Sequence, residues 1–406
     1  MKPTTRSIVV LGSLLTVLAI VLCVCGCGGG PAVNPNPSAQ SWKFVIFGDT
    51  RGDYDQAKTP PYDFATATGV SLVLPQIAAK IASMNPEFVL HVGDLICGDL
   101  YNVAIEAHAP GVVAIPYDQQ FGAFKTAVQP ITAANIPLYT VRGNHEVSAM
   151  EGLNGNPDPT LAAAYYQAFG QYMPQNNPNQ RGLTYSFSHK QVTVVVVDQY
   201  STYVPPTPPP IPWYSPANAI WGTNFWGPHT IDQAWVSAQL RRASTPFKIV
   251  MAHEPIFIAS GVPFAPNAPD YAWSSELYFG PPAFGGTASR QQFVDMLGDS
   301  GVQLYAVGHE HNLSVGSFTD SAGHTMYQLT TGNGGAFPMD NVPDPPTPEA
   351  ALHDVHAELY RPGFTLVTVD PDANTMLMEY YVTDTNGSGW SQEPFTTQMA
   401  GSSPPQ

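Results

Sequence analysis

Short apolar runs alternate with amphipathic stretches along the first half of the chain. Mostly apolar runs occupy positions 43–47, 88–92 and 138–141, which are the lengths of buried strands, whereas 72–84 and 121–134 show the periodicity of helices. Strands that alternate with helices predict βαβ units, in which neighbouring strands are parallel.

The second half of the chain continues this alternation and then changes to strands alone. The predicted segments are a hairpin at 183–187 and 192–197, helices at 231–242 and 289–297, strands at 248–252 and 304–307, and a meander at 313–318, 326–331, 364–369 and 376–382. We therefore predict an α/β fold with two facing mixed β-sheets flanked by helices, a four-layer α/β/β/α sandwich.

The N-terminus has the pattern of an export signal. Lys2 and Arg6 are followed by an apolar stretch over 8–24. Gly26 directly before Cys27 resembles the cleavage and lipidation site of bacterial lipoproteins, in which the cysteine becomes the acylated first residue. We expect an exported chain, anchored through this lipid at the periplasmic or extracellular face of the cell envelope. An uncleaved anchor helix and a plain secretory signal are the alternatives.

Composition divides the chain after this signal, which we place at residues 1–27. Residues 28–41 are rich in Gly, Pro and Asn, as is typical of a flexible linker. Residues 42–385 hold the predicted elements and form one large domain, and 386–406 are predicted to be a flexible tail.

Two stretches inside the large domain combine proline with aromatic residues, at 203–228 and 256–286. Proline disfavours regular structure in both. They are interpreted either as walls of a substrate cleft or as surface cover packed on their own rings.

Charge and cysteine content exclude two classes of protein. The formal net charge is −16 and the Lys and Arg residues form no run, so long nucleic acid is excluded as a partner. Cys97 is the only cysteine beyond the signal, which excludes a disulfide framework. No segment of the sequence indicates an obligate protein partner.

Five groups of polar residues follow predicted strands, in the loops where ligands from distant parts of an α/β chain converge. Their oxygens and neutral imidazole nitrogens suit divalent or trivalent metal ions such as Fe, Zn or Mn. The groups are Asp49 in GDTRG, Asp94 in GDLICGD, Asn144-His145 in RGNHE, His253 in VMAH, and His309 and His311 in GHEH.

A pair of metal ions about 3.5–4 Å apart can clamp a phosphoryl group and bring the pKa of a bound water close to 7. The ordered groups therefore predict a binuclear metal centre that hydrolyses a small phosphorylated substrate by attack of a metal-bound hydroxide.

The ordered forms GD, GDxx, GNHE, VxxH and GHxH resemble the calcineurin-like metallophosphoesterase superfamily over roughly residues 42–385. The last three forms resemble its purple acid phosphatase branch. The resemblance implies that Asp49 and His311 bind the first metal, that Asp94 bridges, that Asn144, His253 and His309 bind the second metal, that His145 acts as acid or transition-state donor, and that Glu146 orients His145.

Two positions depart from the family pattern. Arg51 stands where the family often has a histidine ligand, and a guanidinium cannot ligate a metal. Cys97 stands where purple acid phosphatases have the tyrosine responsible for their colour, so a colourless protein is expected. Asp53, Asp99, Cys97 or water could supply the missing ligand.

Arg51 and Arg142 are candidates for phosphate contact, because a guanidinium fork matches phosphate oxygens. Pairing with a carboxylate, or a place on the surface, is the alternative for each.

These observations predict an exported, membrane-tethered phosphatase that hydrolyses phosphate monoesters, similar to an acid phosphatase. A phosphodiesterase or a nucleotidase would use the same ligands and differ in the width of its cleft. A hypothesis of another class is a catalytically degenerate surface binding protein, because the first metal lacks one ligand at Arg51.

Overall fold

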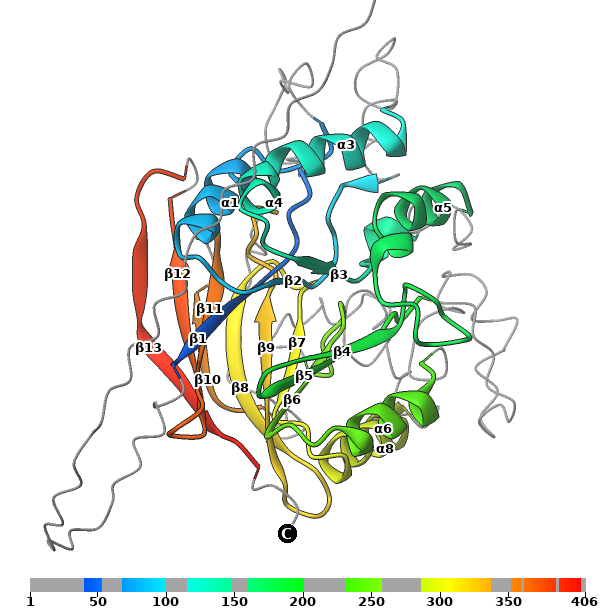
Figure 1. Ribbon diagram of the computed structural model, residues 1–406, viewed down its shortest axis with the longest axis vertical. Helices are drawn as coiled ribbons and strands as arrows, with labels where there is room; N and C mark the ends of the chain where they lie inside the picture. The colour runs from blue at the N-terminus through cyan, green and yellow to red at the C-terminus, as the bar shows by residue number, and fades with distance from the viewer. Residues whose placement is uncertain are drawn as a thin grey trace, which may run out of the picture. The chain divides into compact units, whose positions relative to one another are not determined.

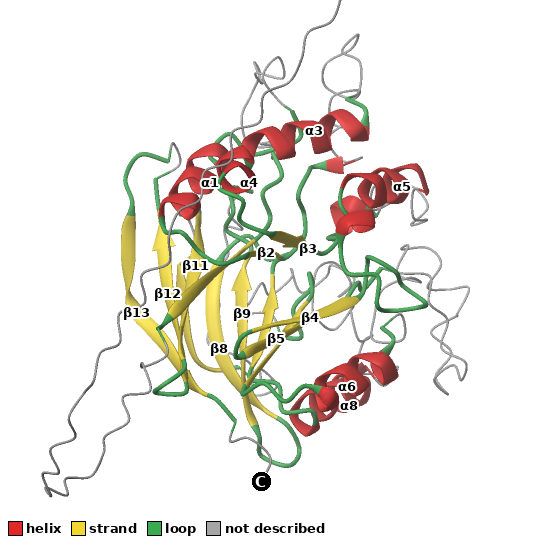
Figure 2. Ribbon diagram, in the orientation of Figure 1, coloured by secondary structure: helices red, strands yellow, loops and turns green. Residues whose placement is uncertain are grey.

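Two mixed β-sheets face each other, and helices cover the outer side of each sheet (Figure 1, Figure 2). This is the predicted four-layer α/β/β/α arrangement. The computed structural model describes residues 40–52, 68–98, 115–147, 159–200, 231–257, 286–336, 352–358, 361–384 and 387–402, all within the compact unit Ala39–Gln406. The predicted signal, nearly all of the linker, 203–228 and almost all of 256–286 lie outside these residues.

The first sheet has six strands in the order β13-β12-β11-β1-β2-β3. β1 lies near its centre, parallel to β2 and antiparallel to β11, so the sheet is mixed. The strands are β1 (Trp42–Phe47), β2 (Val89–His91), β3 (Leu138–Thr140), β11 (Gly363–Asp370), β12 (Thr375–Val382) and β13 (Ser391–Ala400).

The second sheet has seven strands in the order β10-β8-β9-β7-β6-β5-β4. β5, β6, β7 and β9 run parallel, whereas the predicted hairpin of β4 and β5 is antiparallel. The strands are β4 (Tyr185–His189), β5 (Val192–Val196), β6 (Phe247–Met251), β7 (Leu304–Val307), β8 (Leu313–Thr319), β9 (Thr325–Thr331) and β10 (His353–Glu358).

The apolar runs are continuous because the central strands are covered on both faces. Successive residues of a strand point to opposite faces. Phe44 and Ile46 of β1 enter the core between the sheets, whereas Val45 and Phe47 pack against helices. β5 follows the same rule on the second sheet, with Val194 in the inter-sheet core and Val195 under the other helix layer.

The helices present apolar stripes to these outer faces. In α1 (Leu74–Ser83) the buried residues are Leu74, Ile77, Ala78 and Ile81, the spacing of one helix face. The first sheet is covered by α1, α3 (Tyr117–Ala127), α4 (Gln129–Ala133) and α5 (Pro159–Ala168), and the second by α6 (Gln233–Arg242) and α8 (Gly286–Asp299); η1 (Asn144–Glu146) and η2 (Gly170–Tyr172) are short 3-10 turns.

Within the described residues, no helix combines the length and the apolar character needed to cross a membrane.

Some element boundaries differ from the predictions. The helix predicted over 121–134 is two helices, α3 and α4, because Pro130 near the start of α4 has no N–H to continue the first helix. Neither α5 nor β10 was predicted. β10 is an edge strand whose residues are mostly exposed, so it lacks the alternation by which strands are identified.

The prediction of a flexible tail from residue 386 is wrong for β13. This strand pairs antiparallel with β12, and the Tyr380 hydroxyl donates a hydrogen bond of 2.9 Å to Thr397 Oγ1. The polar composition suggested a flexible tail because one face of this edge strand lies in solvent. On the other face, Met399 enters the inter-sheet core.

Met399→Ala should therefore lower the free energy of unfolding by about 2 kcal/mol, because it removes buried apolar volume. Denaturant unfolding followed by circular dichroism measures the change. Gln398→Ala, the exposed neighbour on the same strand, is the matched control and should change stability by less than about 0.5 kcal/mol. Equal effects of the two substitutions would show that β13 does not pack on the core.

Candidate metal centre

The predicted ligands lie in loops at the carboxyl ends of five strands, β1, β2 and β3 of the first sheet and β6 and β7 of the second. Glycines allow these loops to approach one another closely. A Cβ atom at Gly308 would lie 2.0 Å from Asp49 Oδ2, and one at Gly143 would lie 2.0 Å from Asp94 Oδ1. Only glycine leaves room for the two carboxylates at these places.

Three of the predicted ligands have left-handed backbone conformations. The φ angles are 55° at Asp49, 53° at Asp94 and 69° at His309. Such angles are uncommon for residues other than glycine and tend to cluster at functional sites. These turns thus occur at three of the residues whose side chains cluster in the site.

The first group of ligand atoms comes from Asp49, Asp94 and His311. One atom of each lies within 4.8 Å of the others, and all three residues are buried. The backbone N–H of His309 lies 3.0 Å from both carboxylate oxygens of Asp49, which fixes that carboxylate against the loop after β7.

The second group comes from Asp94, Asn144, His253 and His309. His253 Nε2 lies 3.0 Å from Asn144 Oδ1 and 3.3 Å from Asp94 Oδ1. His309 Nδ1 lies 3.2 Å from the same Asn144 oxygen. Asp94 therefore belongs to both groups, as expected for a bridging carboxylate.

The tautomer of His253 follows from its other nitrogen. Nδ1 lies 2.8 Å from the carbonyl oxygen of Val92, and because a carbonyl can only accept, Nδ1 carries the proton. The lone pair of Nε2 then faces the oxygens of Asn144 and Asp94, so three acceptor atoms converge with no hydrogen between them. A cation satisfies this arrangement, and a backbone carbonyl behind the distal nitrogen is typical of a histidine that binds metal.

The electrostatics of the site agree with this fit. Burial lowers the pKa of His253 and of His309 to about 3, which keeps both imidazoles in the neutral form that binds metal. Burial, and next to it the charge of Asp94, raise the pKa of Asp49 well above its usual value. The crowded oxygens therefore favour a bound cation.

Arg51 lies inside the first group. Its Nη2 is 2.9 Å from His311 Nε2, and its Nε is 3.5 Å from Asp94 Oδ2. The expected phosphate contact is thus replaced, in this structure, by contacts with two of the predicted ligands. The first group does not fit a metal ion in this arrangement, whereas the second group does.

His145 is held by a backbone carbonyl and not by Glu146. Its Nδ1 donates to the Cys97 carbonyl oxygen at 2.8 Å, and its Nε2 lies 3.8 Å from Asp94 Oδ2. The predicted orientation of His145 by Glu146 is therefore corrected. The Cys97 thiol is buried and is not among the clustered ligand atoms of the described residues, so this cysteine contributes its backbone.

Glu146 has a different task. Its carboxylate accepts four backbone N–H groups, those of Asp94 (2.9 Å), Leu95 (2.8 Å), Ile96 (3.1 Å) and Gly143 (2.7 Å). Burial, and next to it the charge of Asp94, raise the pKa of Glu146 to about 8, and the backbone N–H groups of Gly143, Ile96 and Asp94 oppose that shift because they favour the ionised form. Glu146 joins the loop after β2 to the loop after β3.

Arg142 is paired with a carboxylate, which corrects its predicted phosphate contact. Its Nε and Nη2 donate to Asp198 Oδ2 at 2.8 and 2.6 Å, and both residues are buried. The same aspartate accepts the backbone N–H of Tyr200 through Oδ1 at 2.8 Å. This pair connects the loop after β3 to the loop after β5, and hence one sheet to the other.

Asp198 and Gln199 were not predicted to belong to the site. Gln199 Oε1 accepts the backbone N–H groups of His253 at 2.9 Å and Glu254 at 2.7 Å, and so it positions the loop that carries His253. Both residues directly follow an apolar strand, the same signal that identified the five ligand groups.

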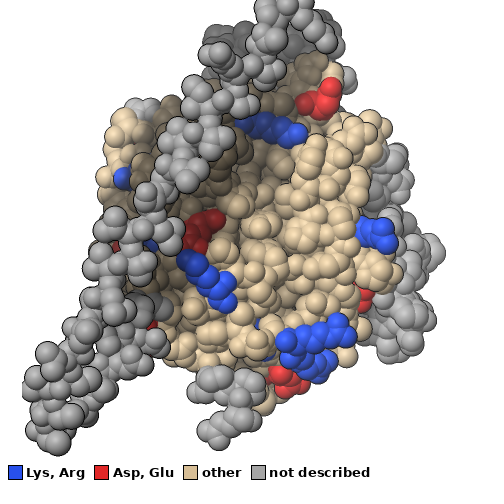
Figure 3. All heavy atoms as spheres, in the orientation of Figure 1, with Lys and Arg blue, Asp and Glu red and all other residues tan. Residues whose placement is uncertain are grey.

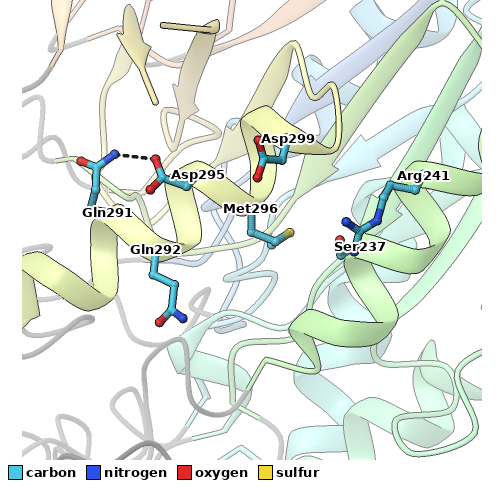
Figure 4. Close-up of a pocket in the computed structure, with 7 residues that line it drawn as sticks. All are labelled: Ser237, Arg241, Gln291, Gln292, Asp295, Met296 and Asp299. Carbon is cyan, nitrogen blue, oxygen red and sulfur yellow. Dashed lines mark hydrogen bonds between the residues drawn. The ribbon is translucent and has the colours of Figure 1, made fainter. Parts of the chain in front are cut away.

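Other polar features lie away from this centre. α6 and α8 line a groove on the outer face of the second sheet, where Gln291 donates a hydrogen bond to Asp295 and where Arg241 lies (Figure 4). Charged side chains are few and scattered over the face of the described residues seen in Figure 3. A second group of potential ligands, Asp299, Asp320 and His324, has two exposed members.

Comparison with known proteins identifies the class. The model of the calcineurin-like phosphoesterase family matches residues 43–313, so the chain belongs to this family of metal-dependent phosphoesterases. No curated protein matches.

Among solved structures, a purple acid phosphatase from yellow lupin (Lupinus luteus) seeds is similar, with a TM-score of 0.55, 16% identity and coverage of 88% of this chain and 54% of that chain. PhoD is also similar, with a TM-score of 0.52, 13% identity and coverage of 90% of this chain and 69% of that chain. This chain thus spans about half the length of the lupin phosphatase, and at these identities the likeness shows the fold.

Glu146→Gln should destabilise the protein by about 3 kcal/mol, because an amide turns its NH2 toward backbone donors and leaves them unsatisfied. Chemical unfolding measures the loss. Glu379→Gln, a carboxylate on β12 that accepts the Gln392 side chain, is the control and should change little. Native stability of Glu146→Gln together with reduced turnover would contradict the structural role and favour direct orientation of His145.

Proposed function

We propose that this chain is an exported, metal-dependent phosphatase that hydrolyses small phosphate monoesters. The observation that carries the proposal is the convergence of Asp94 Oδ1, Asn144 Oδ1 and His253 Nε2, three acceptors that face one another in a buried site. An ion held there, by these residues with His309, would supply Lewis-acid stabilisation of the phosphoryl oxygens.

The chain's own residues complete the site. The Cys97 carbonyl fixes the ring of His145, so its Nε2 lies on the side of Asp94, and in the protonated imidazolium form this nitrogen would donate its proton to the ester oxygen of a bound substrate. Glu146 and the Arg142–Asp198 pair hold the loops rigid around it. Asp and Asn oxygens with neutral imidazoles suit Fe, Zn or Mn in this place.

The monoester specificity rests on the resemblance of the GNHE, VxxH and GHxH motifs to the purple acid phosphatase branch. A phosphodiesterase or a nucleotidase with the same ligands is the second candidate. A degenerate binding protein is disfavoured, because the acceptor atoms of Asp94, Asn144 and His253 face one another as they would around a metal ion.

A substrate panel tests the activity. Protein reconstituted with Mn, Zn or Fe should hydrolyse an aryl phosphate monoester faster than a diester, a nucleotide or a phospholipid. Asp94→Asn should lower turnover of the aryl phosphate by more than about 100-fold, because it weakens a ligand shared by both groups. Faster hydrolysis of the diester or nucleotide would replace the monoester assignment.

Asp372→Asn in the exposed turn after β11 is the control for this substitution and should keep full turnover. Thermal unfolding of both variants separates lost chemistry from lost folding. Unchanged turnover of Asp94→Asn would remove Asp94 from the centre.

Export and lipid attachment at Cys27 are part of the proposal, supported by Gly26-Cys27 after an apolar stretch. Expressed in a bacterium with labelled palmitate, the full chain should carry label and sediment with membranes, whereas Cys27→Ala should lose the label. Cys25→Ala is the matched control and should keep it. Membrane-bound but unlabelled wild-type protein would indicate an uncleaved anchor helix instead.

A further inference from the structure

We propose that the Arg51 guanidinium acts as the resident cation of the first metal subsite, so that this protein binds a single metal ion at the second subsite. The inference rests on the proposed function, since it concerns the same centre. It replaces the expectation of two ions with one ion and one tethered side-chain cation.

The hydrogen bond between Arg51 and His311 has a fixed direction. A guanidinium has only donors, so in the 2.9 Å contact between Arg51 Nη2 and His311 Nε2 the histidine must accept. The lone pair that accepts this bond is the one that would bind a metal. While the contact exists, His311 cannot be a ligand, and the first group is reduced to two carboxylates.

The two aspartates of the first group carry negative charge that must be compensated. Asp49 and Asp94 are buried and lie close together, so their negative charges need a cation within a few ångströms. Arg51 Nε lies 3.5 Å from Asp94 Oδ2, and only 11% of the Arg51 side chain is exposed. A divalent ion added beside this guanidinium would be repelled by its positive charge at short range.

The backbone on both sides of Arg51 is held in place by hydrogen bonds. Arg51 forms an isolated antiparallel bridge with Val70, and the N–H of Gly52 donates to the Gly69 carbonyl at 3.1 Å. On the other side, the Thr50 N–H donates to the Asp94 carbonyl at 2.9 Å. The loop is held at both flanks, so the guanidinium is directed into the site by its backbone.

The two subsites therefore differ in kind. Acceptors face acceptors in the second subsite, which a metal ion resolves. In the first subsite a donor already faces the acceptors Asp94 and His311. The departure at Arg51 from the family's histidine thus changes the centre from two ions to one ion plus an arginine.

Metal content per chain tests the proposal. Purified protein is loaded with Mn²⁺, freed of unbound ion by gel filtration, and analysed by elemental analysis and by electron paramagnetic resonance. Wild type should hold about one ion with the signal of isolated Mn²⁺. Arg51→His should hold about two, with the signal of an exchange-coupled pair.

Two controls make the count specific. Arg241→His places a new histidine in the groove between α6 and α8 and should stay at the wild-type count. Wild type and every variant are made with His324→Ala, because Asp299, Asp320 and His324 form a separate group, with two exposed members, that could bind an ion.

Arg51→Ala, which removes the guanidinium without adding a ligand, should bind a second ion more weakly than Arg51→His. Two ions in wild type would overturn the inference and leave the proposed function intact. No ion in any variant after reconstitution would overturn both. If Arg51→His and Arg51→Ala keep native unfolding temperatures and bind only one ion, Arg51 is not what excludes the second, and the inference fails.

Discussion

The need to compensate two buried carboxylates, Asp49 and Asp94, organises the centre. Water cannot screen either residue, so the chain must bring donors or cations to them. Asp94 accepts the backbone N–H of His145 from the loop after β3 and lies beside Arg51 from the loop after β1. It also lies beside His253 from the second sheet. One carboxylate thus fixes how loops from both sheets meet, and the remaining negative charge makes the site select a cation.

The fold was predictable where burial on two faces produces continuous apolar runs. β1, β6 and β7 were found in this way, since a parallel strand between two layers has no polar face. β13 was missed because the exposed residues of one face give it a polar composition. Its pairing with β12, which makes it part of the sheet, cannot be inferred from the local sequence. β11 and β12 belong to the first sheet, and β8 and β9 belong to the second. This assignment likewise depends on tertiary contacts and not on the local sequence.

The candidate site shows the same division. That these groups lie close together was predictable because strand ends in such folds face a shared crevice, and each group follows an apolar run. The partners of Glu146 and Arg142 could not be predicted, since a charged side chain can take part in catalysis or can stabilise the fold. Only distances decide between these roles. Glu146 meets four backbone N–H groups, and Arg142 meets Asp198, a residue 56 positions away in the chain.

Arg142 and Arg51 show two different roles of a buried arginine. Arg142 is matched by a carboxylate that accepts hydrogen bonds from its Nε and Nη2, so the pair neutralises a charge and joins two loops. Arg51 contacts Asp94 and His311, which are themselves predicted ligands of the centre. A tethered cation cannot be removed by chelation or exchanged for another metal. It also cannot polarise water as a metal ion does, so chemistry that needs an acidic water falls to the second subsite alone.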